Sequence, residues 1–206
     1  MDLKDTYNKI AEDWHADHKN DIWWLEGTGS FCSLLKKGDK VLDVGCGSGL
    51  KSKYLYSKGF DVTGIDLSDK LIDIARRESP GIEFVVMDMK DADKLNRSFD
   101  GIFAQASLLH IPKKEVMKVL ETLVKALKPN GYFYIGVKAK NPEGVEESIL
   151  KESDYGYPYE RFFSYFTMDQ LKSYFNGLKL DIVYENSQIF GKTRWLQIVG
   201  KKSHCY

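Results

Sequence analysis

Cysteines and long apolar runs are scarce in this sequence of 206 residues, and each absence excludes a class of protein. The three cysteines, Cys32, Cys46 and Cys205, have no paired spacing, which argues against a disulfide framework or a zinc knuckle and fits reduced thiols. No apolar run reaches the roughly 18 residues of a membrane-spanning helix, and residues 1–5 lack the apolar core of a signal peptide. We therefore expect a soluble, cytoplasmic protein without a membrane partner.

An excess of positive charge is also absent. Lys and Arg together number 30, and so do Asp and Glu. A nucleic-acid-binding protein usually carries a basic excess that neutralises phosphates, so we expect no nucleic-acid partner. His15, His18 and His204 lack the spacing of metal ligands, and we expect no metal site.

The length suits one domain, residues 1–206, and the first part of it is predicted to be helical. Residues 3–18 carry apolar and aromatic side chains at helical spacing. Residues 21–35 are predicted to form two short helices, or one helix and a loop. We treat residues 1–38 as an N-terminal helical cover, and no repeat or linker divides the rest.

Strand-like and helix-like segments alternate from residue 40 onward. Predicted strands span 41–44, 60–65, 82–86, 99–104 and 132–138, and predicted helices span 50–58, 68–78 and 113–127. This alternation predicts βαβ units and a parallel sheet with helices on both faces. The fold class is therefore α/β, with a doubly wound, mostly parallel seven-stranded sheet.

The C-terminal part departs from this alternation. Residues 139–166 show no clear period and are interpreted as an insertion rich in Tyr and Phe. A capping box at 167–170 opens a helix that reaches about residue 175. Strands predicted at 178–185 and 193–200 are too close for a helical crossover, so we expect an antiparallel C-terminal hairpin.

A glycine-rich turn follows the first predicted strand. Gly45, Gly47 and Gly49 stand at alternate positions before a helix-compatible segment. Glycines allow positive φ and a close approach of a ligand to the backbone, and a helix N-terminus offers free N–H groups. Asp66 and Asp88 end the next two strands, and a carboxylate about 20 residues after such a turn can accept both hydroxyls of a ribose. The combination favours an adenosine-containing ligand, although glycines also permit a plain turn and acids also cap helices.

The spacing of the glycines separates two kinds of adenosine ligand. The dinucleotide-binding fingerprint requires a glycine three positions after its second glycine, where this chain has Leu50. The third glycine comes early, at Gly49. The pyrophosphate-binding turn is therefore not matched, which disfavours an NAD(P)-dependent reductase as the alternative enzyme.

The segment Val41–Gly49 resembles the first motif of the class I S-adenosylmethionine-dependent methyltransferases. Four further segments resemble motifs of this family: Val62–Ser68, Met87–Met89, Phe99–His110 and Leu127–Phe133. The resemblance covers nearly the whole chain. It implies a domain that transfers a methyl group from S-adenosylmethionine to a small-molecule acceptor and releases S-adenosylhomocysteine. A cofactor-binding module without catalysis is a further alternative.

The resemblance also implies which residues surround the cofactor. They lie at the ends of the first four strands and on the N-terminal helix: Tyr7, Trp14, Asp43, Gly45, Cys46, Gly47, Asp66, Leu67, Asp88, Met89, Ala104 and Gln105. In this scheme Asp43 organises the glycine turn, Asp66 holds the ribose hydroxyls and Asp88 accepts from the adenine amino group. Ala104 and Gln105 border the methionine amino group.

Tyr7 and Trp14 would cover the cofactor, although simple packing of an amphipathic helix explains either one equally well.

The catalytic group is less defined, because S-adenosylmethionine carries an activated leaving group. Alignment and a dry pocket are then the main needs, and a base is needed only when the acceptor has a proton to lose. His110 follows the fourth strand and is the best candidate base, with a structural role as the alternative. The segment Ala104–Ser107 lacks both the motif for methylation of base amino groups and the carboxylates of metal-dependent enzymes.

The insertion at 139–166 has two interpretations. Its tyrosines, Tyr155, Tyr157 and Tyr159 among them, line an acceptor pocket as a cap, or they close a small core beneath a loop. Its first half is acidic, which predicts a solvated surface or, as a second reading, recognition of a cationic acceptor.

Overall fold

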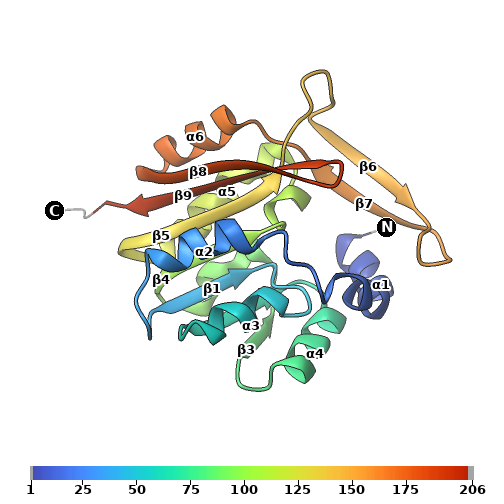
Figure 1. The fold of residues 1–206 in the computed structure, drawn as a ribbon, viewed down its shortest axis with the longest axis horizontal. Helices are drawn as coiled ribbons and strands as arrows, with labels where there is room; N and C mark the ends of the chain where they lie inside the picture. Colours follow the sequence, from blue (N-terminus) through green and yellow to red (C-terminus); the bar gives the residue numbers. More distant parts are fainter. Residues whose placement is uncertain (1, 204–206) are drawn as a thin grey trace.

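The computed structural model describes residues 2–203, which form a seven-stranded sheet with helices on both faces and a separate β-hairpin (Figure 1). His204 and Cys205 lie outside the described residues. The strands are β1 Lys40–Val44, β2 Asp61–Asp66, β3 Glu83–Val86, β4 Phe99–Gln105, β5 Leu127–Lys138, β6 Glu147–Glu152, β7 Tyr159–Ser164, β8 Leu180–Phe190 and β9 Thr193–Lys202. The α-helices are α1 Leu3–His18, α2 Leu25–Ser33, α3 Leu50–Ser57, α4 Asp69–Glu78, α5 Lys113–Lys125 and α6 Met168–Gly177. Two short 3₁₀ segments are η1 Met89–Leu95 and η2 Leu108–His110.

The strand order of the main sheet is β3-β2-β1-β4-β5-β9-β8. Neighbouring strands from β3 to β5 are parallel, whereas β9 is antiparallel to both β5 and β8. The predicted doubly wound, mostly parallel sheet with a C-terminal antiparallel hairpin is confirmed. The chain order reverses between β1 and β4, and in such sheets ligands bind at the carboxyl ends of the strands at this point.

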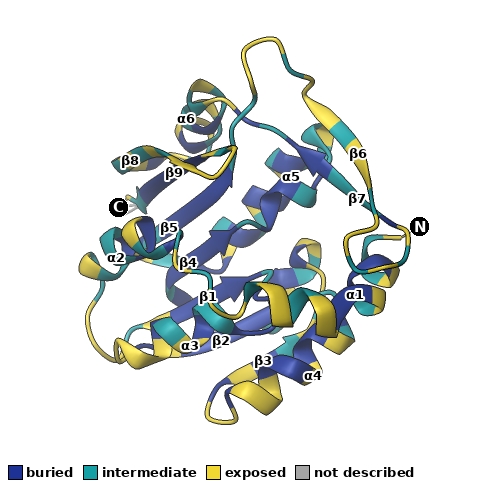
Figure 2. Ribbon diagram, turned by 45° about the vertical axis from the view of Figure 1, so that its right-hand side comes forward, coloured by how far each residue is buried: buried dark blue, intermediate teal, exposed yellow. Residues whose placement is uncertain are grey.

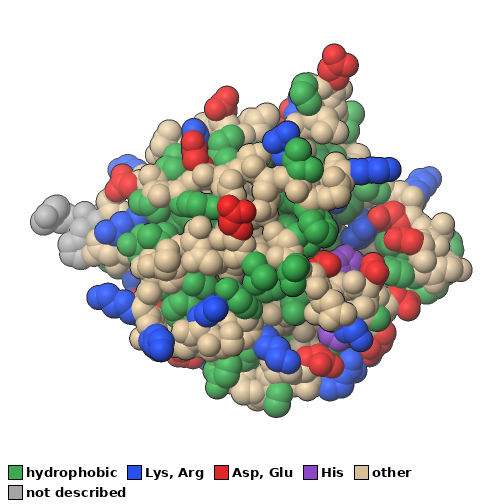
Figure 3. All heavy atoms as spheres, in the orientation of Figure 1, with side chains coloured by type: hydrophobic (Ala, Val, Ile, Leu, Met, Phe, Trp, Pro, Cys, Tyr) green, Lys and Arg blue, Asp and Glu red, His purple; other side chains and the backbone are tan. Residues whose placement is uncertain are grey.

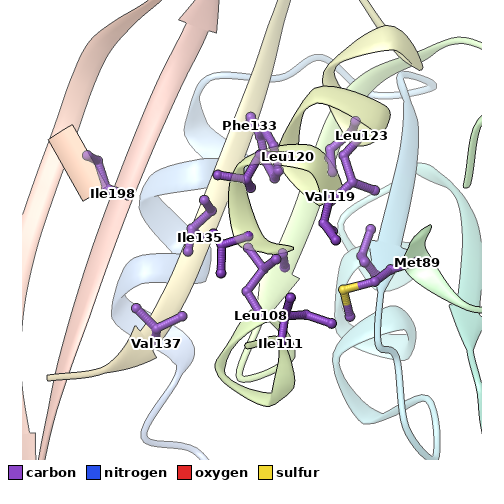
Figure 4. Close-up of a cluster of buried hydrophobic side chains, with 14 of the residues drawn as sticks. Met89, Leu108, Ile111, Val119, Leu120, Leu123, Phe133, Ile135, Val137 and Ile198 are labelled. Carbon is purple, nitrogen blue, oxygen red and sulfur yellow. The ribbon is translucent and has the colours of Figure 1, made fainter. Parts of the chain in front are cut away.

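The central strands β1 and β4 are buried on both faces (Figure 2). Alternate residues of a strand point to opposite sides, so each face of the sheet has its own cluster. On one face, Leu120 and Leu123 of α5 pack with Phe133 and Ile135 of β5 (Figure 4). On the other face, Phe31 of α2 joins a cluster with Phe103 and Tyr134, whose rings stack with centroids 4.6 Å apart. At the end of each strand, the side chains therefore point alternately to one face of the sheet and to the other.

Several helix boundaries follow from local sequence. Ser68 caps α4, and its Oγ accepts from Leu71 N at 3.1 Å. Thr167 and Gln170 form the predicted capping box of α6. Residues 21–35 contain one helix, α2, rather than two. None of the helices within residues 2–203 is both long and apolar enough to cross a membrane.

The insertion at 139–166 differs from its predicted irregular conformation. It contains the antiparallel hairpin β6–β7, in which Leu150 pairs with Arg161. Strand β6 is exposed along most of its length, so its sequence carries no apolar alternation. Pairing with β7 fixes its extended conformation. The buried side of β7 faces α1, which lies between this hairpin and α4 (Figure 1).

Candidate functional site

The glycine turn between β1 and α3 has the backbone that its sequence requires. Gly45, Gly47 and Gly49 all have positive φ, at 69°, 55° and 82°. A Cβ at position 45 would lie 2.3 Å from the Cβ of Ser107, which follows β4. Only glycine therefore lets the turn lie directly against the end of β4.

Asp66, at the end of β2, is tied to this turn. Its Oδ2 accepts from Gly47 N and its Oδ1 accepts from Ser68 N, both at 2.9 Å. The side chain is 9% exposed, and burial raises the pKa of its carboxyl group although these N–H groups oppose the rise. Each oxygen accepts one bond and has room for a second, so the carboxylate is held in place with acceptor capacity to spare.

A cavity of about 210 Å³ lies along the turn and the carboxyl ends of β1, β2 and β4. It brings together most of the residues expected at the cofactor site: Tyr7, Trp14, Gly45, Cys46, Gly47, Asp66, Leu67, Asp88, Met89 and Gln105, together with His110. These residues come from five separate segments of the chain. The expected convergence of Asp66 and Asp88 in one groove is observed.

Two residues of the expected set do not line this cavity. Ala104 is fully buried and belongs to the cluster on the α5 face of the sheet. Side chains alternate along β4, so the next residue, Gln105, points to the opposite face. Asp43 lies below the turn and accepts from Ser52 Oγ of α3 at 2.6 Å. Burial raises its pKa to about 6, against the effect of the Ser52 hydrogen bond. Asp43 therefore anchors α3 to β1.

Two polar atoms at the end of β4 have no hydrogen-bond partner among residues 2–203. They are Gln105 Nε2 and Ser107 Oγ, and both residues line the cavity. Both atoms are buried, and the Gln105 amide is directed to Tyr134, whose hydroxyl donates to Gln105 Oε1. Ser107 was not singled out from the sequence. The sequence feature that is related to Ser107 is Gly45, which has no side chain and so leaves room for it. The sequence does not reveal this contact, because the two residues are far apart in the chain.

His110 forms two hydrogen bonds that fix its protonation. Its Nδ1 lies 2.7 Å from the Phe162 carbonyl oxygen, which can only accept, so Nδ1 carries the proton. Its Nε2 then accepts from the Tyr7 hydroxyl at 2.8 Å. Burial lowers the pKa of His110 to about 3. The imidazole is therefore neutral with its lone pair engaged, an arrangement that positions Tyr7.

A second cavity of about 370 Å³ adjoins the first. Six residues line both: Tyr7, Trp14, Cys46, Lys51, Ala106 and His110. The second cavity is further bordered by Trp23, Trp195 and Phe190 and by two cationic residues, Lys138 and Arg161. None of these five was singled out from the sequence. Histidine side chains lie beside acidic and basic ones on the right of the face in Figure 3.

The tyrosines of the insertion lie outside both cavities. Tyr155 and Tyr159 stack with ring centroids 5.4 Å apart, and Tyr159 is buried in a cluster with Ile10 of α1. The Tyr157 hydroxyl donates to Asp13. The insertion reaches the site through β7 alone, with Arg161 and Phe163. Within residues 2–203, no group of His, Cys, Asp and Glu side chains is arranged to hold a metal ion.

Comparisons with known proteins agree with this geometry. Residues 41–131 match the family of the methyltransferase domain. The putative methyltransferase YqeM of Bacillus subtilis is 31% identical over 147 residues, which is 68% of this chain and 57% of that protein. Phosphoethanolamine N-methyltransferase 1 of Arabidopsis thaliana is 39% identical over 127 residues, 58% of this chain and 25% of that protein. The chain thus spans from about a quarter to just over half of these relatives.

Solved structures share the fold over nearly the whole chain. The 1,6-didemethyltoxoflavin-N1-methyltransferase of Burkholderia thailandensis, solved with 1,6-didemethyltoxoflavin and S-adenosylhomocysteine, has a TM-score of 0.78 at 19% identity. The match covers 98% of this chain and 88% of that one. A methyltransferase from Methanosarcina mazei has a TM-score of 0.74 at 22% identity, covering 89% and 99%. The chain contains a class I S-adenosylmethionine-dependent methyltransferase domain, an enzyme family whose cofactor is S-adenosylmethionine.

Proposed function

We propose that this protein binds S-adenosylmethionine in the cavity along the glycine turn and methylates a small molecule held in the adjoining cavity. The observation that carries the proposal is the carboxylate of Asp66, which Gly47 N and Ser68 N hold in one cavity with the glycine turn and Asp88. Carboxylate acceptors beside a glycine turn suit a ligand with ribose hydroxyls.

The roles of the residues follow from their positions. Asp66 accepts from the ribose hydroxyls with its free lone pairs, and the exposed Asp88 accepts from the adenine amino group. Gln105 and Ser107 border the cavity at the end of β4. S-adenosylmethionine, when bound, supplies an activated methyl group. Tyr7 and Trp14 of α1 line the cavity and exclude water, which an in-line displacement requires.

The acceptor is proposed to be a small molecule. Two similar proteins bear names with small-molecule acceptors, phosphoethanolamine and 1,6-didemethyltoxoflavin. The adjoining cavity of about 370 Å³ has the size of a small-molecule site. The free thiols of Cys32 and Cys46 support a reducing, cytoplasmic location.

Calorimetric titration with S-adenosylhomocysteine tests the cofactor assignment. We expect binding by the wild type and affinity about tenfold to a hundredfold weaker in Asp66→Asn, since hydrogen bonds to a charged group are lost. Asp73→Asn, on the exposed side of α4, is the matched control and should bind like the wild type. Binding of NAD(H) in place of S-adenosylhomocysteine would overturn the proposal. Cofactor binding without transfer of labelled methyl across a broad acceptor panel would instead support a binding module.

A further inference from the structure

The larger cavity has flat aromatic walls. Trp23 and Trp195 stack with ring centroids 4.1 Å apart and planes 24° apart. Trp14 stacks on His18 with centroids 4.5 Å apart. All four residues line the cavity, and Phe190, which also lines it, stacks with Trp23 at a centroid distance of 6.1 Å. Such walls favour a ligand that contains a flat ring.

Strands of two different sheets, β5 and β7, each bring a cation to this cavity. Arg161 of β7 forms a bidentate ion pair with Glu152 of β6, through N–H···O bonds of 2.7 and 2.6 Å. Lys138 ends β5, and its Nζ lies 4.0 Å from the centroid of the Phe163 ring. Among the described residues 2–203, Lys138 Nζ has neither an ion pair nor a hydrogen bond. Arg161 has a carboxylate in ion-pair contact, whereas Lys138 contacts the face of an aromatic ring and only senses Glu152 through space.

The other charges of the cavity do not compensate Lys138. Lys51 interacts with Asp43 and Asp21. Asp21 also accepts from the Trp23 indole N–H at 3.3 Å, and Asp17 is exposed to solvent. Burial and the positive charge of Arg161 lower the pKa of Lys138 to about 8. Glu152 opposes this shift without pairing with Lys138. A partly buried cation that has no carboxylate in hydrogen-bond contact is stabilised when an anionic ligand binds beside it.

The acidic part of the insertion does not supply a site for a cationic acceptor. Glu143 and Glu147 are exposed and line neither cavity. Glu146 pairs with Lys113 and Lys140 on the outside of the molecule. These three acids therefore lie outside the cavity, whereas Glu152 pairs with Arg161. The charged side chains that line the cavity from β5 and β7 are the cations Lys138 and Arg161.

We propose that Lys138, supported by Arg161, binds an anionic group, a carboxylate or a phosphate, on an acceptor whose flat ring packs against Trp23, Trp195 and Trp14. This inference rests on the proposed function, because it names the class of its acceptor. Tyr7 and His110 line both cavities. An acceptor whose anionic group lies at Lys138 therefore has its opposite end beside Tyr7 and His110, toward the cofactor cavity.

Calorimetry on the full chain saturated with S-adenosylhomocysteine tests this inference with three probes of one shape: 2-naphthoate, 2-naphthyl phosphate and the uncharged 2-naphthamide. At pH 7 we expect one of the two anions to bind at least about tenfold more tightly than the amide, as for a hydrogen bond to a charged group. The tighter anion identifies carboxylate or phosphate as the recognised group. Lys138→Gln should bring the anions within about twofold of the amide.

Lys201→Gln is the matched control, because Lys201 also lies over an aromatic ring, that of Tyr132 at 5.9 Å, but outside both cavities. It should keep the preference of the wild type. Equal binding of anions and amide, no binding of either anion, or a preference that survives in Lys138→Gln would overturn the inference. Failure of S-adenosylhomocysteine itself to bind would be a failure of the proposed function, and the first titration detects it separately.

Discussion

The hydroxyl of Tyr7 donates a hydrogen bond to Nε2 of His110 at 2.8 Å, across 103 positions of the chain. The same imidazole donates from Nδ1 to the carbonyl of Phe162, just beyond Arg161 on β7. One neutral side chain thus joins the N-terminal helix, the segment after β4 and the inserted hairpin. Each of these three parts contributes to the lining of the larger cavity, and His110 ties them together.

This arrangement predicts that His110 does not titrate near neutrality. Its pKa is lowered to about 3 by burial, so its imidazole stays neutral between pH 5 and 8. Heteronuclear NMR of ¹³C-labelled histidine should show one set of ring signals with no shift over this range. The spectrum of His110→Gln assigns that set by its absence. A midpoint between pH 6 and 7 for His110 would restore it as a candidate general base.

The close contact at the glycine turn predicts a large effect of one methyl group. Gly45→Ala must accept a positive φ and a Cβ 2.3 Å from that of Ser107. Gly38→Ala has a positive φ as well, but nothing lies within 4 Å of its Cβ. We expect a loss of about 1 kcal/mol of unfolding free energy for Gly38→Ala and about 1–3 kcal/mol more for Gly45→Ala. Urea denaturation without cofactor measures the unfolding free energy of both variants. Equal losses would show that Ser107 moves aside at no cost in free energy.

The buried carboxyl of Asp43 predicts a pH-dependent stability. Its pKa is raised to about 6 in the folded state, so the folded state binds more protons than the unfolded state between pH 4 and 6. Stability contributed by the protonated form is therefore lost as pH rises through this range. Since one pKa unit corresponds to about 1.4 kcal/mol, Asp43→Asn should gain about 3 kcal/mol relative to wild type from pH 4 to pH 7. Asp61→Asn, at an exposed position, should show no such trend in denaturant titrations.

Anion binding at Lys138 is predicted to weaken in alkali. The free amine has a pKa of about 8, and only its protonated form attracts an anion. The charged groups that face it are Arg161 and Glu152, which form an ion pair with each other, and His110 stays neutral. Calorimetry from pH 7 to pH 9 should show naphthoate affinity falling by roughly tenfold, while naphthamide affinity stays constant. A flat profile for naphthoate would assign the anion to Arg161 instead.

Local signals in the sequence predicted much of the fold. The apolar runs of the parallel strands, the Ser68 cap and the Thr167 capping box each act within a few residues, and the structure contains all of them. Strand ends also located the groove that contains Asp66 and Asp88. Hairpin β6–β7 was missed because β6 is exposed and its extended form depends on its partner strand.

The sequence by itself determined the α/β sheet, the glycine turn and the acids beside it, because periodicity and backbone preference are local properties. Only the tertiary structure decided that His110 is neutral, that Ser107 lies against Gly45, and that Lys138 and Arg161 line one cavity. Burial and charge compensation depend on contacts between residues that are distant in the chain. No spacing along the sequence records those contacts.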